Sequence, residues 1–572
     1  MRHALAVVLA IAPFLPVLPL RGASTPAPAG TGGAVASADA LATRAGLDIL
    51  RAGGNAVDAA VATALALAVV YPEAGNLGGG GFAVLKTGDR VTTLDFRETA
   101  PAAASRTMYL DAAGKPVENA SLVGPLAAGI PGSPAGLWEL QRKMGKLPWA
   151  QVVAPARKLA AEGFAVDRHL HELLDKEETR KLLLRFPETA KLWYPGGTPL
   201  AAGTVLRLPE LAATLDRYAE RGPEGVVTGA GAAAVEAASR RYGGILTAAD
   251  LAAYKPVWRD PLLLQGFGWK IAAMPLPSSG GIILGQTLGM LERLGWAKLP
   301  RFGADRAHLL TEVFRRSFAD RFLLGDPGTT RASAAQLLDP VWLDKRAREI
   351  RLDRATPSVQ VQPWSGEPRR PEGTETTHLS VVDGDGNLVA LTTTLNGLFG
   401  CGLYVPEVGY FLNNEMDDFA TAPGKPNLFG LIQGEANAVG PGKRMLSSMV
   451  PMIAWKGAGT ASEAIALGGR GGSRIPTNTI EVLLNVIVDG DPLQTALDRP
   501  RLHHQWLPDR LEAEPDALAP ETRAELERRG HTVVVNDVTA KVHAVHRLAD
   551  GRVEAGSDPR GTGLGGIVNL QN

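Results

Sequence analysis

The 572-residue sequence contains a single cysteine, Cys401, so no disulfide can form within the chain. A chain of this length can bury a core that is stable without covalent links, and the shortage of cysteine therefore says nothing about the redox state of its compartment. No histidine or lysine neighbours Cys401 in the sequence. We interpret it as a small packed residue and not as a reactive thiol.

The chain also lacks net charge, because its 59 lysines and arginines equal its 59 aspartates and glutamates. That balance argues against nucleic acid or an anionic membrane surface as the main partner. A small charged substrate stays compatible with the composition, since it needs local charges and no overall field.

Long hydrophobic runs are scarce. The run Ala59–Val70 is too short to span a bilayer, and we expect no membrane span in the mature protein. The first run, Ala4–Leu20, follows a positively charged start and precedes small residues. This pattern predicts an export signal at residues 1–24 and a periplasmic or secreted protein. Three prolines make the run a poor helix, so a disordered apolar tail is the alternative.

Motifs for metals, phosphates and serine hydrolysis are missing as well. The sequence has no paired cysteines, no His-Glu-x-x-His and no Gly-x-Ser-x-Gly. The glycine-rich segment Gly75–Gly81 follows a helical pattern without Gly-Lys-Ser/Thr, so we do not expect it to bind phosphate. Asp383–Asn387 begins like a calcium loop, but Leu388 occupies the position of the required glycine. We expect neither a metal nor a cofactor.

Residue patterns predict a mixture of helices and strands. Ala34–Val70 is alanine-rich with helical periodicity, and Ala307–Phe322 is a second clear helix. Phe82–Leu85 and Val91–Phe96 have the character of strands. Ala355–Glu375 is rich in proline, glycine and charge, which predicts an exposed, poorly ordered linker.

The residues after this linker predict a β-hairpin. Two β-branched runs flank the Asp383–Asn387 turn, and a tip at Asp385 places Thr376 opposite Thr394. Residues that face each other across a ladder have neighbouring side chains, so the two hydroxyls should lie close together. On spacing alone, a plain hairpin whose threonines merely suit strands is the favoured interpretation.

The run TTHLSVVDGDGNLVALTTTLN (Thr376–Asn396) resembles the start of the small subunit of γ-glutamyltranspeptidases, which are N-terminal nucleophile hydrolases. Collinear similarity extends from about residue 34 to the C-terminus. It is strongest in eight further segments: Gly75–Phe82, Leu94–Pro101, Pro131–Gly136, Met274–Gly281, Leu412–Phe419, Asn437–Pro451, Gly471–Ile475 and Arg499–Asp509.

The resemblance implies an α/β fold, a four-layer αββα sandwich, in place of the several domains that length alone suggests. It further implies that the precursor cuts its own backbone between Glu375 and Thr376. Residues 25–375 then form a large subunit and residues 376–572 a small subunit, and the two remain intertwined as a heterodimer.

The resemblance also assigns the catalytic residues. Thr376 is the expected nucleophile, and its freed α-amine, with an ordinary pKa of ~8, is the expected base. Thr394 matches the second threonine that hydrogen-bonds the nucleophile. The backbone amides of Gly471 and Gly472 match the oxyanion hole, although the family often has proline where this chain has Arg470.

Substrate-binding roles follow from the same resemblance. Arg97 matches a clamp for the α-carboxylate of a γ-glutamyl group, a role suited to a planar guanidinium, and Ser447 and Ser448 add hydrogen bonds. The substrate's ammonium group would be held by Asn396, Glu415 and Asp418. A segment similar to the family's lid loop follows, with an aromatic gate: Pro423–Gly440 and Phe429.

These expectations describe a γ-glutamyltransferase and glutathione hydrolase. Its substrates would be glutathione and other γ-glutamyl compounds, and its acceptors water, amino acids or dipeptides. Two alternatives stay open: an acylase of the same fold that acts on a cephalosporin side chain, and a non-catalytic protein that kept the fold. An acyl group without the amino-acid head would leave the charges of the pocket unpaired, which weighs against the acylase.

Overall fold

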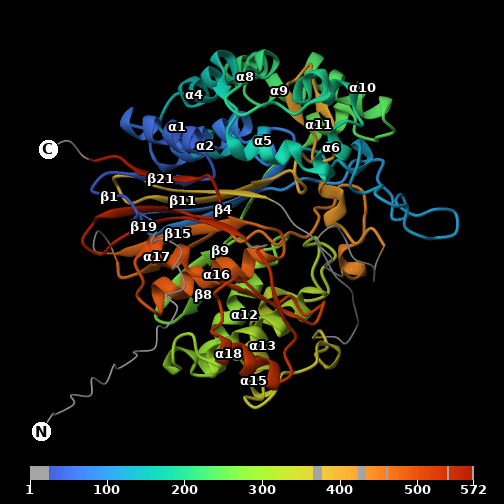
Figure 1. Ribbon diagram of the computed structural model, residues 1–572. Coiled ribbons are helices and arrows are strands. Elements are labelled where there is room, and N and C mark those ends of the chain that lie inside the picture. Colours follow the sequence, from blue (N-terminus) through green and yellow to red (C-terminus); the bar gives the residue numbers. More distant parts are fainter. Residues whose placement is uncertain (1–24, 365–375, 423–432, 459–461, 538–539, 570–572) are drawn as a thin grey trace, which may run out of the picture.

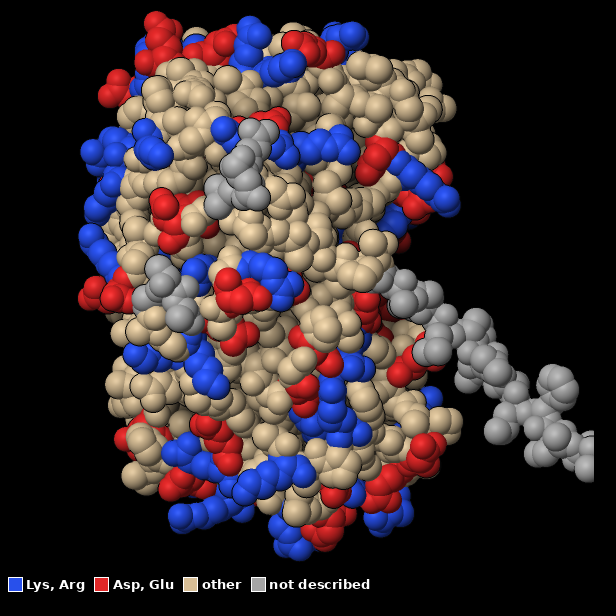
Figure 2. All heavy atoms as spheres, turned by 90° about the vertical axis from the view of Figure 1, so that its left-hand side faces the viewer, with Lys and Arg blue, Asp and Glu red and all other residues tan. Residues whose placement is uncertain are grey.

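The computed structural model describes residues 25–364, 376–422, 433–458, 462–537 and 540–569. Two β-sheets are stacked at the centre, and helices cover the outer face of each, so that the chain forms four layers in the order αββα (Figure 1). The predicted fold class is confirmed. Lysines and arginines are interspersed with aspartates and glutamates over the face drawn in Figure 2, in keeping with the zero net charge.

The first sheet carries the predicted hairpin at its centre. Its strand order is β21-β2-β10-β11-β3-β4-β7. The strands are β21 (Leu564–Ile567), β2 (Ala34–Ser37), β10 (Thr377–Val382), β11 (Leu388–Thr394), β3 (Gly80–Thr87), β4 (Arg90–Phe96) and β7 (Val257–Arg259). Strands from the first hundred residues thus flank the hairpin on both sides, which interleaves the two halves of the chain.

The second sheet has the order β1-β20-β19-β15-β14-β9-β8. Its strands are β1 (Ala29–Gly30), β20 (Val553–Ser557), β19 (Lys541–Arg547), β15 (Glu463–Arg470), β14 (Met452–Lys456), β9 (Trp269–Ala273) and β8 (Leu262–Gly266). Three small sheets lie outside the sandwich and contain β5 (Phe164–Ala165) with β6 (Val205–Leu206), β12 (Tyr404–Val405) with β13 (Tyr410–Phe411), and β16 (Leu502–His503), β17 (Leu511–Ala513) and β18 (Val533–Val535).

Helices of the upper layer pack on the first sheet (Figure 1). The central one, α2, is hydrophobic on all sides and every one of its residues is buried, as expected for a helix enclosed by other elements. This half of the chain contains α1 (Ala40–Arg51), α2 (Ala56–Val70), α3 (Ser133–Met144), α4 (Trp149–Glu162), α5 (Arg168–Asp175), α6 (Glu177–Leu183), α7 (Pro187–Trp193), α8 (Pro209–Arg221), α9 (Glu224–Val227), α10 (Gly229–Arg241) and α11 (Ala248–Ala253).

Helices of the lower layer cover the second sheet. The expected helix at Ala307–Phe322 is present as α13. The group consists of α12 (Gly280–Arg293), α13 (Ala304–Arg321), α14 (Ala334–Leu337), α15 (Pro340–Arg348), α16 (Arg474–Ile487), α17 (Leu493–Asp498) and α18 (Pro520–Arg528). Among the residues that the structure describes, no helix has both the length and the apolar character needed to cross a membrane.

One sequence-based prediction of local structure was wrong, and a second is confirmed only in part. Ala34–Ser37 is not helical but forms β2, because it pairs with β10 on one side and with β21 on the other. Half of the first ten residues of the predicted linker are exposed, as expected, but the segment is anchored at buried positions. Ser358 is fully buried, its amide donates to Asp509 (2.7 Å), and its carbonyl accepts from the indole of Trp506 (2.8 Å). Residues 365–375 lie outside the described part of the chain.

Candidate active site

The hairpin brings Thr376 and Thr394 together, as its spacing predicts. The ladder pairs Thr377 with Thr393, so Thr376 and Thr394 occupy the next register position. Their hydroxyl oxygens are 3.4 Å apart, and both residues are buried. The Thr394 hydroxyl oxygen also accepts the backbone amide of Asn396 at 2.7 Å, and in the bond between the two threonines either hydroxyl can be the donor.

The glycine-rich loop at Gly75–Gly81 supports the strand end that carries Thr394. A Cβ atom on Gly79 would lie 2.0 Å from the Thr394 carbonyl oxygen, so only glycine fits there. Asn76 accepts the Gly79 amide (3.0 Å) and donates to the same Thr394 carbonyl (2.8 Å). The loop therefore has a positioning role, which explains its composition without a phosphate ligand.

Thr376 lies in a small cavity that collects most of the predicted site residues. It is lined by Arg97, Thr376, Asn396, Glu415, Asp418, Ser447, Ser448, Met449, Gly472 and Ile475. These residues come from segments that are separated by as many as 378 positions, from Arg97 to Ile475. Met449 and Ile475 were not predicted, because an apolar wall residue carries no distinctive signal in a single sequence.

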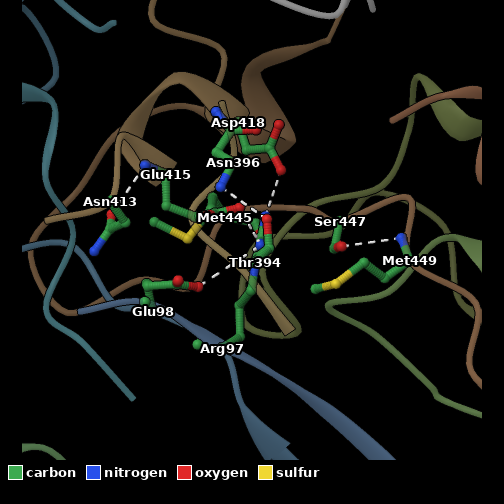
Figure 3. Close-up of polar contacts among 12 residues, drawn as sticks. Arg97, Glu98, Thr394, Asn396, Asn413, Glu415, Asp418, Met445, Ser447 and Met449 are labelled. Carbon is green, nitrogen blue, oxygen red and sulfur yellow. Dashed lines mark hydrogen bonds and ion pairs between the residues drawn. The ribbon is translucent and has the colours of Figure 1, made fainter. Parts of the chain in front are cut away.

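Arg97 follows β4 directly and is buried within a cluster of acidic side chains (Figure 3). Its guanidinium forms hydrogen-bonded ion pairs with Glu415 and Asp418, and it lies 3.7 Å from the carboxylate of Glu98. The resemblance assigns Arg97 to a substrate carboxylate, and Glu415 and Asp418 to a substrate ammonium. In this structure the two sets are paired with each other.

Three carboxyl groups surround this one guanidinium, and we call Glu98, Glu415 and Asp418 the carboxylate cluster. Burial raises the pKa of Glu98 to about 7, although the charge of Arg97 opposes the shift. Burial likewise raises the pKa of Glu415 and of Asp418, again against Arg97. Glu98 is therefore partly protonated near neutral pH, and a cation that enters the cluster favours the loss of this proton.

Ser447 and Ser448 line the same cavity as Arg97, Glu415 and Asp418. The Ser447 hydroxyl oxygen accepts the Met449 amide at 3.1 Å (Figure 3), and the Ser448 hydroxyl oxygen accepts from the Arg321 guanidinium at 3.1 Å. Since each oxygen already accepts a hydrogen bond, each hydroxyl proton is left to donate toward an anion in the cavity.

Glu98 and Arg321 are polar residues of the site that the sequence reasoning missed. Glu98 lies within the matched Leu94–Pro101 segment, so the signal was present there. Arg321 ends α13, and helical periodicity predicts the helix but does not show which of its charged residues is turned inward.

Asn396 adopts a left-handed backbone conformation, with φ of 70°, at the end of the hairpin. Its side-chain amide donates to the Asn414 carbonyl at 3.0 Å. The side chain of Asn413 accepts the amides of Gly129 and Glu415, both at 2.9 Å. These bonds hold the turn that carries Glu415 against Asn396. Asparagine is one of the residues that adopt this conformation most readily, which suits it to the turn at the end of the hairpin.

Gly471 and Gly472 connect β15 to α16 and have φ values of 137° and 54°. A Cβ atom on Gly471 would lie 2.6 Å from the Cα of Ala540, so a side chain does not fit. Gly472 lines the cavity beside Thr376, close to the N-terminus of a 14-residue helix. Backbone amides and the helix dipole both favour a negative charge at this place.

Several other candidates have structural environments. Cys401 is buried, and burial raises its pKa to about 12, in agreement with a packed thiol. Burial lowers the pKa of His503 to about 3 and of His504 to about 4, so both are neutral at physiological pH. The Asp383 carboxylate accepts the Ala56 amide (3.0 Å) and amides of its own turn, and so acts as a cap.

No group of three or more candidate metal ligands occurs among the residues that the structure describes. In the segment predicted as a lid, residues 423–432, including Phe429, lie outside the described part. Its second half is held at the site, because Gln433 and Asn437 donate to the Asp418 carbonyl at 2.7 and 2.6 Å.

Known proteins resemble the chain in sequence and in fold. A family model described as gamma-glutamyltranspeptidase matches residues 42–567. The glutathione hydrolase proenzyme of Escherichia coli (strain K12) is 42% identical over 530 residues, which cover 92% of this chain and 90% of that protein.

Two solved structures extend the comparison. A gamma-glutamyltranspeptidase from Pseudomonas nitroreducens, complexed with L-DON, is 41% identical, with a TM-score of 0.55 over 58% of this chain and 98% of that one. A cephalosporin acylase from Bacillus halodurans has a TM-score of 0.81 over 98% of this chain and all of that one, at 26% identity.

Proposed function

The chain belongs to the gamma-glutamyltranspeptidase family and is a γ-glutamyltransferase and glutathione hydrolase, and on that premise we propose how its own residues perform the reaction. Thr376 is the nucleophile, and cleavage of the backbone between Glu375 and Thr376 releases it. The proposal is supported by one cavity that Thr376 and Gly472 both line. The same cavity contains a buried positive charge, Arg97, and two buried acids, Glu415 and Asp418.

Cleavage begins when the Thr376 hydroxyl attacks the carbonyl carbon of Glu375. The C–N bond breaks as an ester bond forms, and the hydroxyl proton passes to the departing nitrogen. Water then hydrolyses the ester, which leaves a carboxylate on Glu375 and a free α-amine on Thr376. An α-amine has an ordinary pKa of ~8, so it can accept a proton near neutral pH.

In turnover, the α-amine takes the proton of the Thr376 hydroxyl as the oxygen attacks the γ-carbonyl of the substrate. The amides of Gly471 and Gly472 stabilise the oxyanion, and loss of one such donor typically costs ~3 kcal/mol. The leaving amine departs with that proton as the C–N bond breaks. Water or an acceptor amine then attacks the γ-glutamyl ester and restores Thr376.

Substrate recognition follows from an exchange of ion pairs. A γ-glutamyl head group carries a carboxylate and an ammonium on one carbon. Its carboxylate can take the place of the acids at Arg97, with Ser447 and Ser448 as further donors, while its ammonium enters the carboxylate cluster. Because the head group has no net charge, the exchange buries no unpaired charge. Asn396 supplies an additional acceptor for the ammonium.

The acylase alternative shares the fold but not this chemistry. The Bacillus halodurans structure named as a cephalosporin acylase aligns over nearly the whole chain, yet at 26% identity, against 42% for the Escherichia coli glutathione hydrolase proenzyme. A side chain with a carboxylate but no ammonium would displace Glu415 and Asp418 from Arg97 and leave them without a cation, so the composition of the cavity favours a γ-glutamyl group.

The wider organisation follows from the same proposal. Residues 25–375 become the large subunit and residues 376–572 the small subunit of a heterodimer, which the interleaved first sheet holds together. The donors are glutathione and other γ-glutamyl compounds, and the acceptors are amino acids or dipeptides. Residues 1–24 direct export to the periplasm or the medium.

The test compares turnover of γ-glutamyl-p-nitroanilide by the wild type and by Thr376→Ala, which should be inactive and uncut. A wild type that is inactive on this compound but cleaves a cephalosporin side chain would favour the acylase. Absence of both activities, together with an uncut chain, would favour a non-catalytic protein.

A further inference from the structure

Arg470 is the last residue of β15 and directly precedes the glycine pair that faces Thr376. It is buried, with 4% of its surface exposed. Across the ladder, Arg470 pairs with Lys541 of β19, and Gly468 pairs with His543. Two cationic residues are therefore neighbours at the end of the second sheet that lies beside the nucleophile.

Alternation along β15 shows into which space the Arg470 side chain extends. A Cβ atom on Gly468 would point at the His378 ring of the first sheet, 2.5 Å away, whereas one on Gly469 would approach Thr479 of α16. Arg470 has the same parity as Gly468 and so faces the space between the sheets. Thr376 has the same parity as His378 and faces the same space from β10.

The contacts of His543 agree with this placement of the Arg470 backbone, and a ring contact shows how far the side chain extends. Burial is the main cause that lowers the pKa of His543 to about 4; Asp558 opposes the shift, and the charges of Arg470 and Lys541 contribute to it, in keeping with their place beside His543. The Arg470 guanidinium lies 5.3 Å from the centroid of the Tyr71 ring, at the end of α2. The Tyr71 ring in turn stacks on His169.

Arg470 and Lys541 do not line the cavity at Thr376, which we call the γ-glutamyl pocket. Arg97 follows β4, and Ser447 and Ser448 precede β14, so the pocket extends from Thr376 toward that side of the sandwich. In the second sheet β15 lies between β14 and β19. The strand β10, which Thr376 precedes, packs on β15 and β19, the strands that carry Arg470 and Lys541. A leaving amine that extends from Thr376 away from the pocket would approach this end of β15 and β19.

We propose that Arg470 and Lys541 form a subsite for the carboxylate of the leaving amine, and of the amino acid or peptide that replaces it as acceptor. This inference rests on the proposed function. A guanidinium binds a carboxylate through charge-assisted hydrogen bonds, and Lys541 adds a second positive charge. Donors whose leaving group ends in a carboxylate, such as glutathione, are the class that this subsite selects.

The test compares glutathione with its glycinamide analogue, which has the same γ-glutamyl group and scissile bond but lacks the terminal carboxylate. Wild type should prefer glutathione by about 10-fold or more in kcat/KM, because a hydrogen bond to a charged group has that order of effect. Arg470→Gln should raise the KM for glutathione by a similar factor, with kcat nearly unchanged, and should remove the preference.

Controls separate this inference from the proposed function. Turnover of γ-glutamyl-p-nitroanilide, whose leaving group has no carboxylate, should change by less than about twofold in Arg470→Gln. Arg348→Gln, an exposed arginine of α15, should behave as wild type. If wild type fails to turn over the p-nitroanilide, the proposed function fails; if it succeeds and Arg470→Gln retains the preference, only the subsite fails.

Because Arg470 is buried, gel analysis and circular dichroism must show that the Arg470→Gln variant is cleaved and folded. Lys541→Met, at a half-buried position, then provides the second variant and should reduce the preference in part. The ratio of the wild-type kcat/KM values for glutathione and its glycinamide analogue tests the subsite without either variant. Equal kcat/KM values for glutathione and its glycinamide would overturn the subsite.

Discussion

Binding of glutamate, the product of hydrolysis, should release a proton from the carboxylate cluster. With a pKa of about 7, Glu98 is protonated in about half of the molecules at pH 7. The carboxylate of glutamate pairs with Arg97 and offsets the charge that lowers the pKa of Glu98, while its ammonium enters the carboxylate cluster and favours the ionised form. The pKa of Glu98 therefore falls on binding if the ammonium lies closer to Glu98 than the guanidinium does, at 3.7 Å. The ligand itself does not titrate between pH 5.5 and 8, which leaves the protein as the source of the proton.

The magnitude follows from linkage. Well below pH 7 each pH unit changes the dissociation constant by up to tenfold. Because Glu98 is already half ionised at pH 7, the affinity should rise by at most about 16-fold, or ~1.6 kcal/mol, from pH 5.5 to 7. Above pH 7 it should level off. Isothermal titration of the cleaved enzyme at pH 7, in two buffers with different heats of ionisation, measures the released proton directly.

Two variants identify the group that titrates. Glu98→Gln should reduce both the proton release and the pH dependence. Glu481→Gln is a matched control, because burial raises the pKa of Glu481 to about 8, but this residue lines a different cavity. A heat of binding that does not depend on the buffer, with a flat affinity from pH 5.5 to 8, would refute the reasoning.

Substitutions at three further positions test the hairpin pairing, the oxyanion loop and a buried ion pair. Thr394→Val removes the hydroxyl that bonds Thr376 and should lower kcat for γ-glutamyl-p-nitroanilide about 5- to 10-fold, whereas Thr394→Ser should retain most of it; equal rates for the two would contradict the pairing. Gly471→Ala forces a Cβ against Ala540 and should displace the oxyanion loop, which lowers kcat by about 100-fold or more; near-normal kcat would argue against that role. Burial alone would raise the pKa of Glu312, but the adjacent Arg315 and Arg316 lower it to about 2. The charge of Glu312 therefore stabilises the fold fully above pH 4.5, and this contribution is lost as the pH falls toward 2. Glu312→Gln should therefore lower the free energy of unfolding by ~3 kcal/mol at pH 7 and by less at pH 3.5, as measured in urea; a difference that does not depend on pH would be inconsistent with this ion pair.

Local signals in the sequence predicted the hairpin. β-Branched runs around the Asp383–Asn387 turn fixed both its strands and its register, and so the pairing of Thr376 with Thr394. The helix α13 was predicted for the same reason, since its apolar residues recur with helical spacing. These features depend on residues close together in the chain.

Long-range contacts account for what local patterns missed. β2 is an alanine-containing strand because β10 and β21, hundreds of residues away, pair with its edges. Ser358 is buried because Asp509 and Trp506 bind its backbone, although the surrounding segment, Ala355–Glu375, has the composition of a linker. Similarity to the family located Arg97 and Glu415, but only the three-dimensional structure shows that they form an ion pair across 318 positions.

The central claim is that the chain cuts itself to expose Thr376. Denaturing gel electrophoresis and N-terminal mass analysis of the purified protein test it most directly. The account predicts two fragments from the wild type, the smaller of which begins at Thr376, and one intact chain from Thr376→Ala. A wild-type protein that remains a single chain, of up to 60.1 kDa, or a cut at any other bond, would contradict it.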